Sequence, residues 1–169
     1  KLGIQPTVTD STPLPFRVAG AIGMEDQAQF NPLKFLYGIA SVPDIRENTF
    51  VHHLEADTAY TANGSIKAKA IVIATHFPFV NVPGLYFLKM YQHRSYVIAL
   101  ENGPQLDGMY VDESEKGHSF RNYQNFLLLG GGDHKTGKAG GMYDEIRALA
   151  RKAYPECRET YAWATQDCM

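Results

Sequence analysis

The apolar positions of residues 1–41 show little periodicity until Asn31, where a helical pattern begins. Prolines on both sides of Leu14 restrict the backbone there to extended conformations. From Asn31, an N-cap residue, Pro32 takes the first helical position, and apolar residues follow at helical spacing until Ser41. The pattern predicts an extended arm followed by one helix.

Short strand-like segments follow the helix and predict an antiparallel meander. The dipeptide Asn63-Gly64 is typical of a tight hairpin turn. The run Ile71-Val72-Ile73 is continuously apolar, which is typical of a strand covered on both faces. We predict strands over 47–54, 57–61, 65–69 and 70–74.

The second half of the chain alternates strand patterns with turn residues, and then reads as a helix and a last strand. Glycines, prolines and acidic residues separate the apolar segments. Residues 130–141 are glycine-rich and predict a loop. We predict an antiparallel sheet of strands 95–100, 108–112, 118–121 and 126–129, a helix over 143–154 and a strand over 160–165. The fold class predicted is α+β.

Composition excludes several classes of protein. Of the 169 residues, 44% are hydrophobic and 20% are charged, which is ordinary for a globular chain. The net charge is -2, and the basic residues do not gather into a stripe that could follow a phosphate backbone, so we expect no nucleic-acid partner. The apolar runs are far shorter than the roughly 20 residues of a membrane span. We expect a cytoplasmic protein without a membrane segment.

Both termini read as cut ends. The chain begins with Lys1 instead of Met, and its last residue, Met169, directly follows a dense aromatic and polar strand pattern. Domain ends are usually polar and loosely patterned. We therefore expect a fragment of a longer polypeptide.

The sequence gives little support to metal or hydrolase chemistry. The neighbours His52 and His53 point to opposite faces of a strand, so they cannot share a metal ion. Cys157 and Cys168 are too few for a disulfide framework or a zinc site. We predict no metal site, two reduced thiols, and histidines that lie at the surface or in hydrogen bonds.

The segment Gly132–Ala139 follows a predicted strand and precedes a helix, as the phosphate loop of a nucleotide hydrolase does. Such a loop ends on a serine or threonine whose hydroxyl binds magnesium, and Ala139 has no hydroxyl. The predicted helix also begins several residues too late to aim its N-terminus at a phosphate. We therefore predict that this loop does not bind nucleotide.

Arg94 and Arg121 lie at or beside strands of the predicted sheet, where a planar guanidinium can grip a substrate carboxylate through two hydrogen bonds. The alternative is that each pairs with a carboxylate at the sheet edge, such as Asp112. Tyr96 can line a pocket over a flat cofactor, or it can belong to the core, as aromatic residues in strands usually do.

Several segments taken together resemble the D-amino-acid oxidase and glycine oxidase family of FAD-dependent oxidoreductases. The resemblance is carried by Ile45–Val51, the Asn63-Gly64 hairpin, Ile66–His76 and Trp163–Asp167. The chain most resembles a bacterial branch of that family, some members of which carry a C-terminal Rieske iron-sulfur domain. The segments that indicate this branch are Ala74-Thr75-His76, Gly84–Phe87, Arg94-Ser95-Tyr96 and Gly131–Gly137.

The resemblance implies a cofactor, FAD, and a place for several residues. Val51 is expected beside the adenine of FAD, and Ala74, Thr75 and His76 near its dinucleotide. The antiparallel sheet is expected to roof the flavin and to form the substrate pocket, with Arg94, Tyr96 and Arg121 in it. The implied domains are an arm and helix at a domain junction (1–41), a partial Rossmann-like FAD-binding domain (42–76), a substrate-binding sheet (77–141), and a helix and strand that return to the FAD-binding domain (142–169).

The chain departs from that family in lacking the Gly-x-Gly-x-x-Gly segment that cradles the FAD pyrophosphate. We therefore expect a fragment that is inactive alone and needs the missing segments of the same polypeptide. The whole enzyme would oxidise a small amine or amino acid by hydride transfer to the flavin. The alternative is a non-catalytic module that binds a ligand or a protein.

Overall fold

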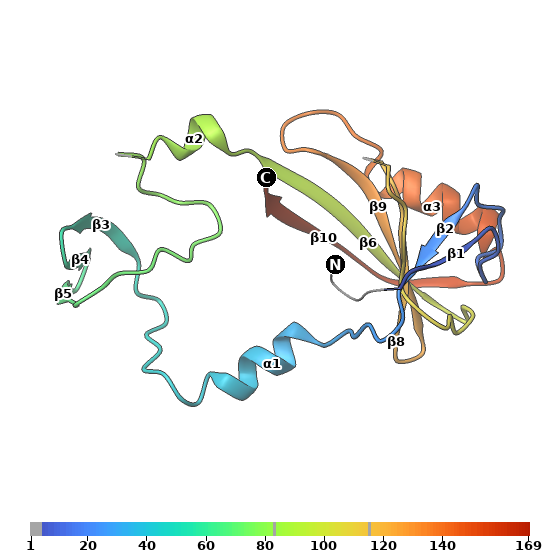
Figure 1. Cartoon of the computed structure of the whole chain (residues 1–169). Helices are drawn as coiled ribbons and strands as arrows, with labels where there is room; N and C mark the ends of the chain where they lie inside the picture. Colours follow the sequence, from blue (N-terminus) through green and yellow to red (C-terminus); the bar gives the residue numbers. More distant parts are fainter. Residues whose placement is uncertain (1–4, 83, 115) are drawn as a thin grey trace. The chain divides into compact units, whose positions relative to one another are not determined.

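The computed structural model describes residues 5–82, 84–114 and 116–169, so the first residues of the predicted arm lie outside it. The chain divides into two compact units, and Figure 1 labels their helices and strands. The first unit comprises the residues up to Val8 together with Ile22–Gly84, and the second comprises Thr9–Ala21 and Leu85–Met169. Each unit is described by itself.

The second unit is built on a five-stranded sheet whose strand order is β10-β6-β9-β8-β7. Its neighbouring strands all pair antiparallel. This confirms the predicted α+β architecture and its antiparallel sheet. Four of the five strands run longer than the sequence pattern predicted, whereas β7 is shorter. The strands are β6 (Gln92–Glu101), β7 (Tyr110–Val111), β8 (Ser119–Tyr123), β9 (Phe126–Lys135) and β10 (Arg158–Cys168).

Helix α3 (Met142–Ala153) covers one face of this sheet and closes the core. Ile146 and Ala150 are its buried residues, one turn apart, so they lie on the same face of the helix. Acidic residues occupy its first turn and basic residues its last turn, which suits the helix dipole. The buried cluster that it completes consists of Tyr96, Ile98, Leu100, Phe120, Leu127, Leu129, Ile146, Ala150 and Tyr154.

An ion pair ties α3 to β10. Arg147 donates to Glu159 from its Nε, 2.8 Å from Oε2, and from its second terminal nitrogen, 2.6 Å from Oε1. Hydrogen bonding to Arg147 holds the pKa of the Glu159 carboxyl below its ordinary value, and partial burial opposes that shift. Residues 142–169 belong with the five-stranded sheet to the second unit.

The arm before the first helix adds to the same core. Leu14 packs against the buried cluster, and the ring of Phe16 lies 5.6 Å from that of Phe120. The arm is extended as predicted, and it includes two short strands, β1 (Thr7–Thr9) and β2 (Ala21–Gly23), which pair with each other.

The prediction that residues 130–141 form one loop was wrong in its first half. β9 continues through Gly130–Lys135, and only the remainder is loop. The register against β6 shifts between Arg94 and Tyr96, which pair with His134 and Gly131, so β9 holds an extra residue there. Gly132 takes a φ of +68° at this bulge, a conformation that favours glycine.

The first unit contains the predicted helix and meander. α1 (Pro32–Ile39) is capped by Asn31, whose side-chain oxygen accepts from the Lys34 N–H at 3.0 Å, as the sequence predicted. The hairpin is also confirmed, although its two turn residues are Ala62 and Asn63, and Gly64 begins the next strand. The strands are β3 (Val51–Glu55), β4 (Thr58–Thr61) and β5 (Gly64–Lys67), in the order β3-β4-β5.

The predicted strand over residues 70–74 is not formed. The meander ends with β5, and no described strand pairs with this segment, so its backbone lacks the ladder that a strand requires. Val72 is 85% exposed and Ile73 40% exposed. A continuous apolar run predicts a strand with other elements packed on both of its faces. Among the described residues of this unit, no such element packs on either side of the run. The described strands therefore do not confirm the predicted Rossmann-like part of the fold.

Replacing Gly132 with alanine should destabilise the second unit more than the same change at Gly137. A Cβ at Gly132 would lie 2.2 Å from the backbone oxygen of Met142, whereas a Cβ at Gly137 meets open space. Both glycines have positive φ, so each variant bears about 1 to 2 kcal/mol of backbone strain. Urea unfolding monitored by circular dichroism measures the difference, and equal losses at the two positions would contradict the predicted close approach.

Candidate functional site: the open face of the sheet

The two faces of the five-stranded sheet differ in what covers them. α3 packs against β6 and β9 on the face that carries Tyr96, Ile98 and Leu100. Because side chains alternate along a strand, Val97 and Ala99 point to the other face. Among the described helices and strands, none packs on that face. We call it the open face.

Aromatic side chains gather on the open face. Ala164 of β10 packs against the core, so its neighbour Trp163 points to the open face, where it is 39% exposed. Tyr161 lies on the same face at 59% exposure, and its ring centroid is 5.6 Å from that of Phe126. Leu128, beneath them on β9, is only 7% exposed. The surface is apolar and aromatic, and it suits a flat ring system.

Arg121 is the predicted site residue that the structure places on the open face. Its neighbour Phe120 is buried in the core, so alternation directs Arg121 to the opposite side of β8. It pairs across the ladder with Leu128, and its side chain is exposed. The guanidinium therefore stands at the margin of the aromatic surface.

Arg94 and Tyr96 lie together on the face that α3 covers. The Arg94 guanidinium carbon is 5.9 Å from the centre of the Tyr96 ring, and the Tyr143 ring of α3 meets that ring edge-on at 4.8 Å. Tyr96 is only 3% exposed. The three pocket residues predicted from sequence are thus divided between the two faces of the sheet.

The hydroxyl of Tyr96 is held by His134. It lies 2.9 Å from the Nε2 of His134, while the Nδ1 of His134 lies 3.0 Å from the backbone oxygen of Lys135. A carbonyl oxygen only accepts, so Nδ1 carries the proton and Nε2 accepts from the Tyr96 hydroxyl. The sequence predicted a surface or hydrogen-bonded histidine at this position, but its partner, 38 residues away, depends on the register of β6 and β9.

Other polar groups of the second unit lie near the short strands. His118 approaches Glu145 of α3, with 3.3 Å between its Nε2 and Oε1. The pKa of Tyr110 is raised to about 12, so this phenol stays protonated at neutral pH. Burial is the main cause of the shift, and a hydrogen bond to Asp107 is the second. The backbone N–H of Ser114 is the main cause of a lowered pKa at Asp112. These groups stabilise the loops around β7 and β8.

The residues predicted to touch FAD lie in the first unit. Val51 begins β3, where it pairs with Thr61. Ala74, Thr75 and His76 are exposed and belong to a tight turn, in which the Phe77 N–H donates to the Thr75 carbonyl at 2.7 Å and His76 has a φ of +63°.

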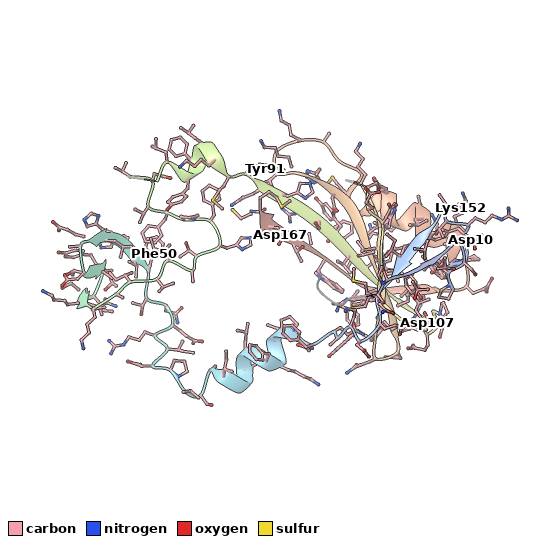
Figure 2. The ribbon with its side chains drawn as sticks, in the orientation of Figure 1. Asp10, Phe50, Tyr91, Asp107, Lys152 and Asp167 are labelled. Carbon is pink, nitrogen blue, oxygen red and sulfur yellow. The ribbon has the colours of Figure 1, made fainter. Side chains whose placement is uncertain are left out.

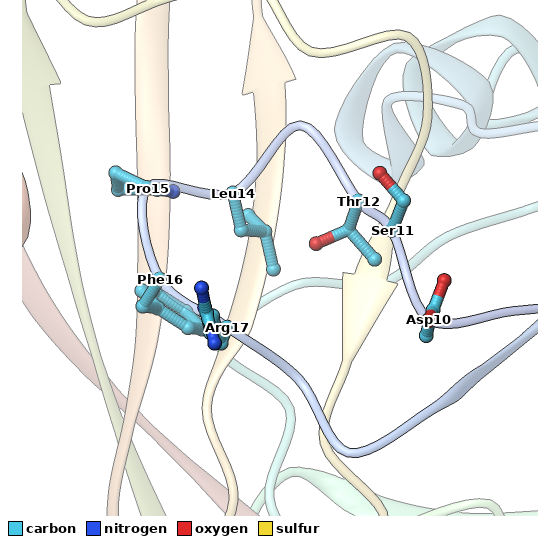
Figure 3. Close-up of a pocket in the computed structure, with 7 residues that line it drawn as sticks. All are labelled: Asp10, Ser11, Thr12, Leu14, Pro15, Phe16 and Arg17. Atoms are coloured by element: carbon cyan, nitrogen blue, oxygen red, sulfur yellow. The ribbon is translucent and has the colours of Figure 1, made fainter.

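The described residues form two surface hollows that contain none of the predicted site residues. One, of about 500 Å³, lies at the start of α1 and is lined by Phe30, Asn31, Lys34 and Phe35. The other, of about 340 Å³, lies along the arm (Figure 3), where residues of that single segment line it: Asp10, Ser11, Thr12, Leu14, Pro15, Phe16 and Arg17. Each hollow is made by one local segment, so neither combines distant groups into a site.

Within residues 5–82, 84–114 and 116–169, no three acidic, histidine or cysteine side chains come close enough to hold a metal ion. The same part of the chain contains no helix that is long and apolar enough to span a membrane.

Changing Tyr96 to phenylalanine should lower the free energy of unfolding by about 0.5 to 1.5 kcal/mol, because His134 loses its hydrogen-bond donor. The nitrogen chemical shift of His134 Nε2 should change in the same variant. Tyr91 to phenylalanine, at a ring stacked under Lys135, is the matched control. If both variants leave the His134 signal unchanged, the assigned hydrogen bond is wrong.

Comparison with known proteins agrees with the resemblance seen in the sequence. A family model described as FAD dependent oxidoreductase matches residues 3–167. The Bacillus subtilis (strain 168) protein named "Putative Rieske 2Fe-2S iron-sulfur protein YhfW" is 31% identical over 186 residues, which cover 99% of this chain and 36% of that protein. No solved structure matches the chain.

The match runs through both units, from the arm to the end of β10, and the family that it defines uses FAD as its cofactor. It includes the predicted cofactor-side residues of the first unit and all of the strands that form the open face. This chain belongs to the family of FAD-dependent oxidoreductases.

Proposed function

We propose that this chain supplies the substrate-side layer of an FAD-dependent oxidoreductase that oxidises a small amine or amino acid. The observation that carries the proposal is the difference between the two sheet faces. One face is filled by α3, whereas the other presents Trp163, Tyr161 and Phe126 beside Arg121. A flat flavin ring and a small substrate need such an apolar wall with a charged group at its margin.

Arg121 is the group that we propose binds the substrate carboxylate. A guanidinium presents its N–H donors in a fixed plane, which matches the two oxygens of a carboxylate. Placed at the edge of an apolar surface, this contact fixes the end of an amino acid while the rest of the molecule lies on the aromatic side chains. Arg94 and Tyr96 were predicted in the same pocket, but the burial of Tyr96 against Tyr143 of α3, with Arg94 beside its ring, favours a structural role.

The described residues fit one wall of a flavin site. The aromatic surface suits the ring system, but α3 offers no pyrophosphate site because Asp144 and Glu145 make its first turn negative. We therefore propose that missing segments of the same polypeptide hold the pyrophosphate in a Rossmann-like domain. From the first unit, Val51 would contact the adenine of FAD, and Ala74, Thr75 and His76 would lie near its dinucleotide.

FAD supplies the redox chemistry when bound, because it accepts a hydride from the carbon that bears the amine. The task of this chain is to hold that carbon in place and to exclude water from it. Loss of the hydride, which is two electrons and one proton, leaves the substrate as an iminium ion, which water hydrolyses. Positioning of this kind needs no acid-base pair from the protein. In the longer protein, a Rieske iron-sulfur domain is a further proposed partner, since the Bacillus relative is named for one.

The chain alone should fold without retaining FAD and should not turn over. After incubation with excess FAD and removal of the free cofactor, the flavin absorption bands should be absent, while circular dichroism shows a folded chain. The physical reason is the missing pyrophosphate cradle. Flavin that stays bound would show that these residues assemble a complete cofactor site, and would overturn the proposal that other segments of the polypeptide hold the pyrophosphate.

Arg121 and Arg94 can be compared directly in the longer enzyme that contains this chain. Arg121→Gln should raise the KM for an amino-acid substrate by about 10- to 100-fold, because a hydrogen bond to a charged group contributes about 1.5 to 3 kcal/mol. Arg94→Gln, the same change on the covered face, should leave KM nearly unchanged. A KM that rises for Arg94→Gln and not for Arg121→Gln would place the carboxylate site on the α3 side. If the longer enzyme oxidises neither amines nor amino acids, the result favours the non-catalytic binding module.

A further inference from the structure

β10 leaves one long edge of the sheet unpaired. It pairs with β6 on one side, and no described strand pairs with its other side. Tyr91, before β6, and Asp167, near the end of β10, mark the same end of these two strands (Figure 2). An unpaired strand of this length presents a row of backbone donors and acceptors to any extended partner.

The hydrogen-bond pattern identifies which backbone groups point outward. Tyr91 and Met169 exchange both backbone hydrogen bonds, at 3.0 and 2.9 Å. Hydrogen-bonded pairs recur at every second residue of an antiparallel ladder, so Trp163 and Val97 form another such pair. The residues between them turn their N–H and C=O groups away from β6. On the unbulged part of β10 these are Ala162, Ala164, Gln166 and Cys168.

Native proteins usually protect such an edge with lysine, proline or a bulge. In β10 the bulge is confined to the region between Glu159 and Tyr161. Beyond it, residues 161–168 contain neither lysine nor proline, and Asp167 is their one charged residue. Tyr161 and Trp163, which are aromatic and partly exposed, stand along the same stretch. The edge is therefore well suited to pairing.

We propose that this edge pairs with β10 of a second copy of the chain, antiparallel and centred on Ala164. The two-fold axis then sets Ala164 against its own copy, and Ala162 against Gln166 of the partner subunit. These are the residues whose backbone groups point outward, so each donor finds an acceptor. The two sheets join into one continuous sheet across the axis.

The side chains that face each other across this axis are compatible. Trp163 faces Thr165 of the partner subunit on the open face, an aromatic and β-branched pair of the kind that stabilises neighbouring strands. Asp167 faces Tyr161 of the partner subunit, so like charges do not meet. Centring the axis on Trp163 would instead set Glu159 against Asp167, and centring it on Ala162 would use the bulged region. The self-complementary register favours a second copy over an unrelated extended peptide.

Ala162→Pro tests the pairing with little disturbance of the sheet, because the N–H that it removes points away from β6. Ala162→Thr keeps that N–H and is the matched control. Light scattering after gel filtration should give the unchanged chain and Ala162→Thr twice the 18.8 kDa mass of one chain, and Ala162→Pro the mass of one chain. A monomeric unchanged chain overturns the proposal, as does a dimer that survives in a folded Ala162→Pro variant.

Amide hydrogen exchange on the unchanged chain decides the matter if Ala162→Pro does not fold. In the proposed dimer the amides of Ala162 and Ala164 exchange slowly at high protein concentration and faster on dilution. Fast exchange of both amides in a dimeric sample would show that the copies meet elsewhere, for instance through the exposed apolar residues of α1. Protection that appears only when another polypeptide is added would assign the edge to a different partner, and would likewise overturn the proposal.

Discussion

The second unit depends on the burial of β6 and β9 beneath α3. Ile98, Leu127, Leu129 and Ile146 are all fully buried, and they come from the two central strands and the helix. Each fully buried aliphatic side chain contributes about 1.5 to 3 kcal/mol relative to an exposed one, so this cluster dominates the stability of the unit. Because α3 covers one face of β6 and β9, the other face is the one that we propose for substrate.

The sequence predicts the elements of this unit well because their patterns are local. The apolar run at Phe126–Leu129, the helical spacing of Ile146 and Ala150, and the turn residues between strands need no knowledge of distant partners. The capped helix α1 and the hairpin before Gly64 were predicted for the same reason. The family, too, could be predicted, since its segments occur in order along the chain.

What the sequence could not predict depends on pairing between distant residues. The faces of Arg94, Tyr96 and Arg121 follow from which neighbours are buried, and periodicity alone does not show which side α3 will cover. For the run Ile71–Ile73 the local pattern is clear, but its prediction of burial needs a layer that covers the strand. The described residues of its own unit provide no such layer.

The bulge in β9 has a consequence for how insertions and deletions act on this protein. Gly131 and His134 are three residues apart, so an unbroken strand would turn them to opposite sides, yet they pair with Tyr96 and Arg94, which share a side. The extra residue reverses the odd-even count of the strand. Deleting one residue between Leu129 and His134 would leave a regular strand in which Gly131 and His134 are two residues apart and still share a side, so His134 would stay beside Tyr96. The bulge thus lets this segment hold one additional residue without moving the later side chains of β9 to the other face of the sheet.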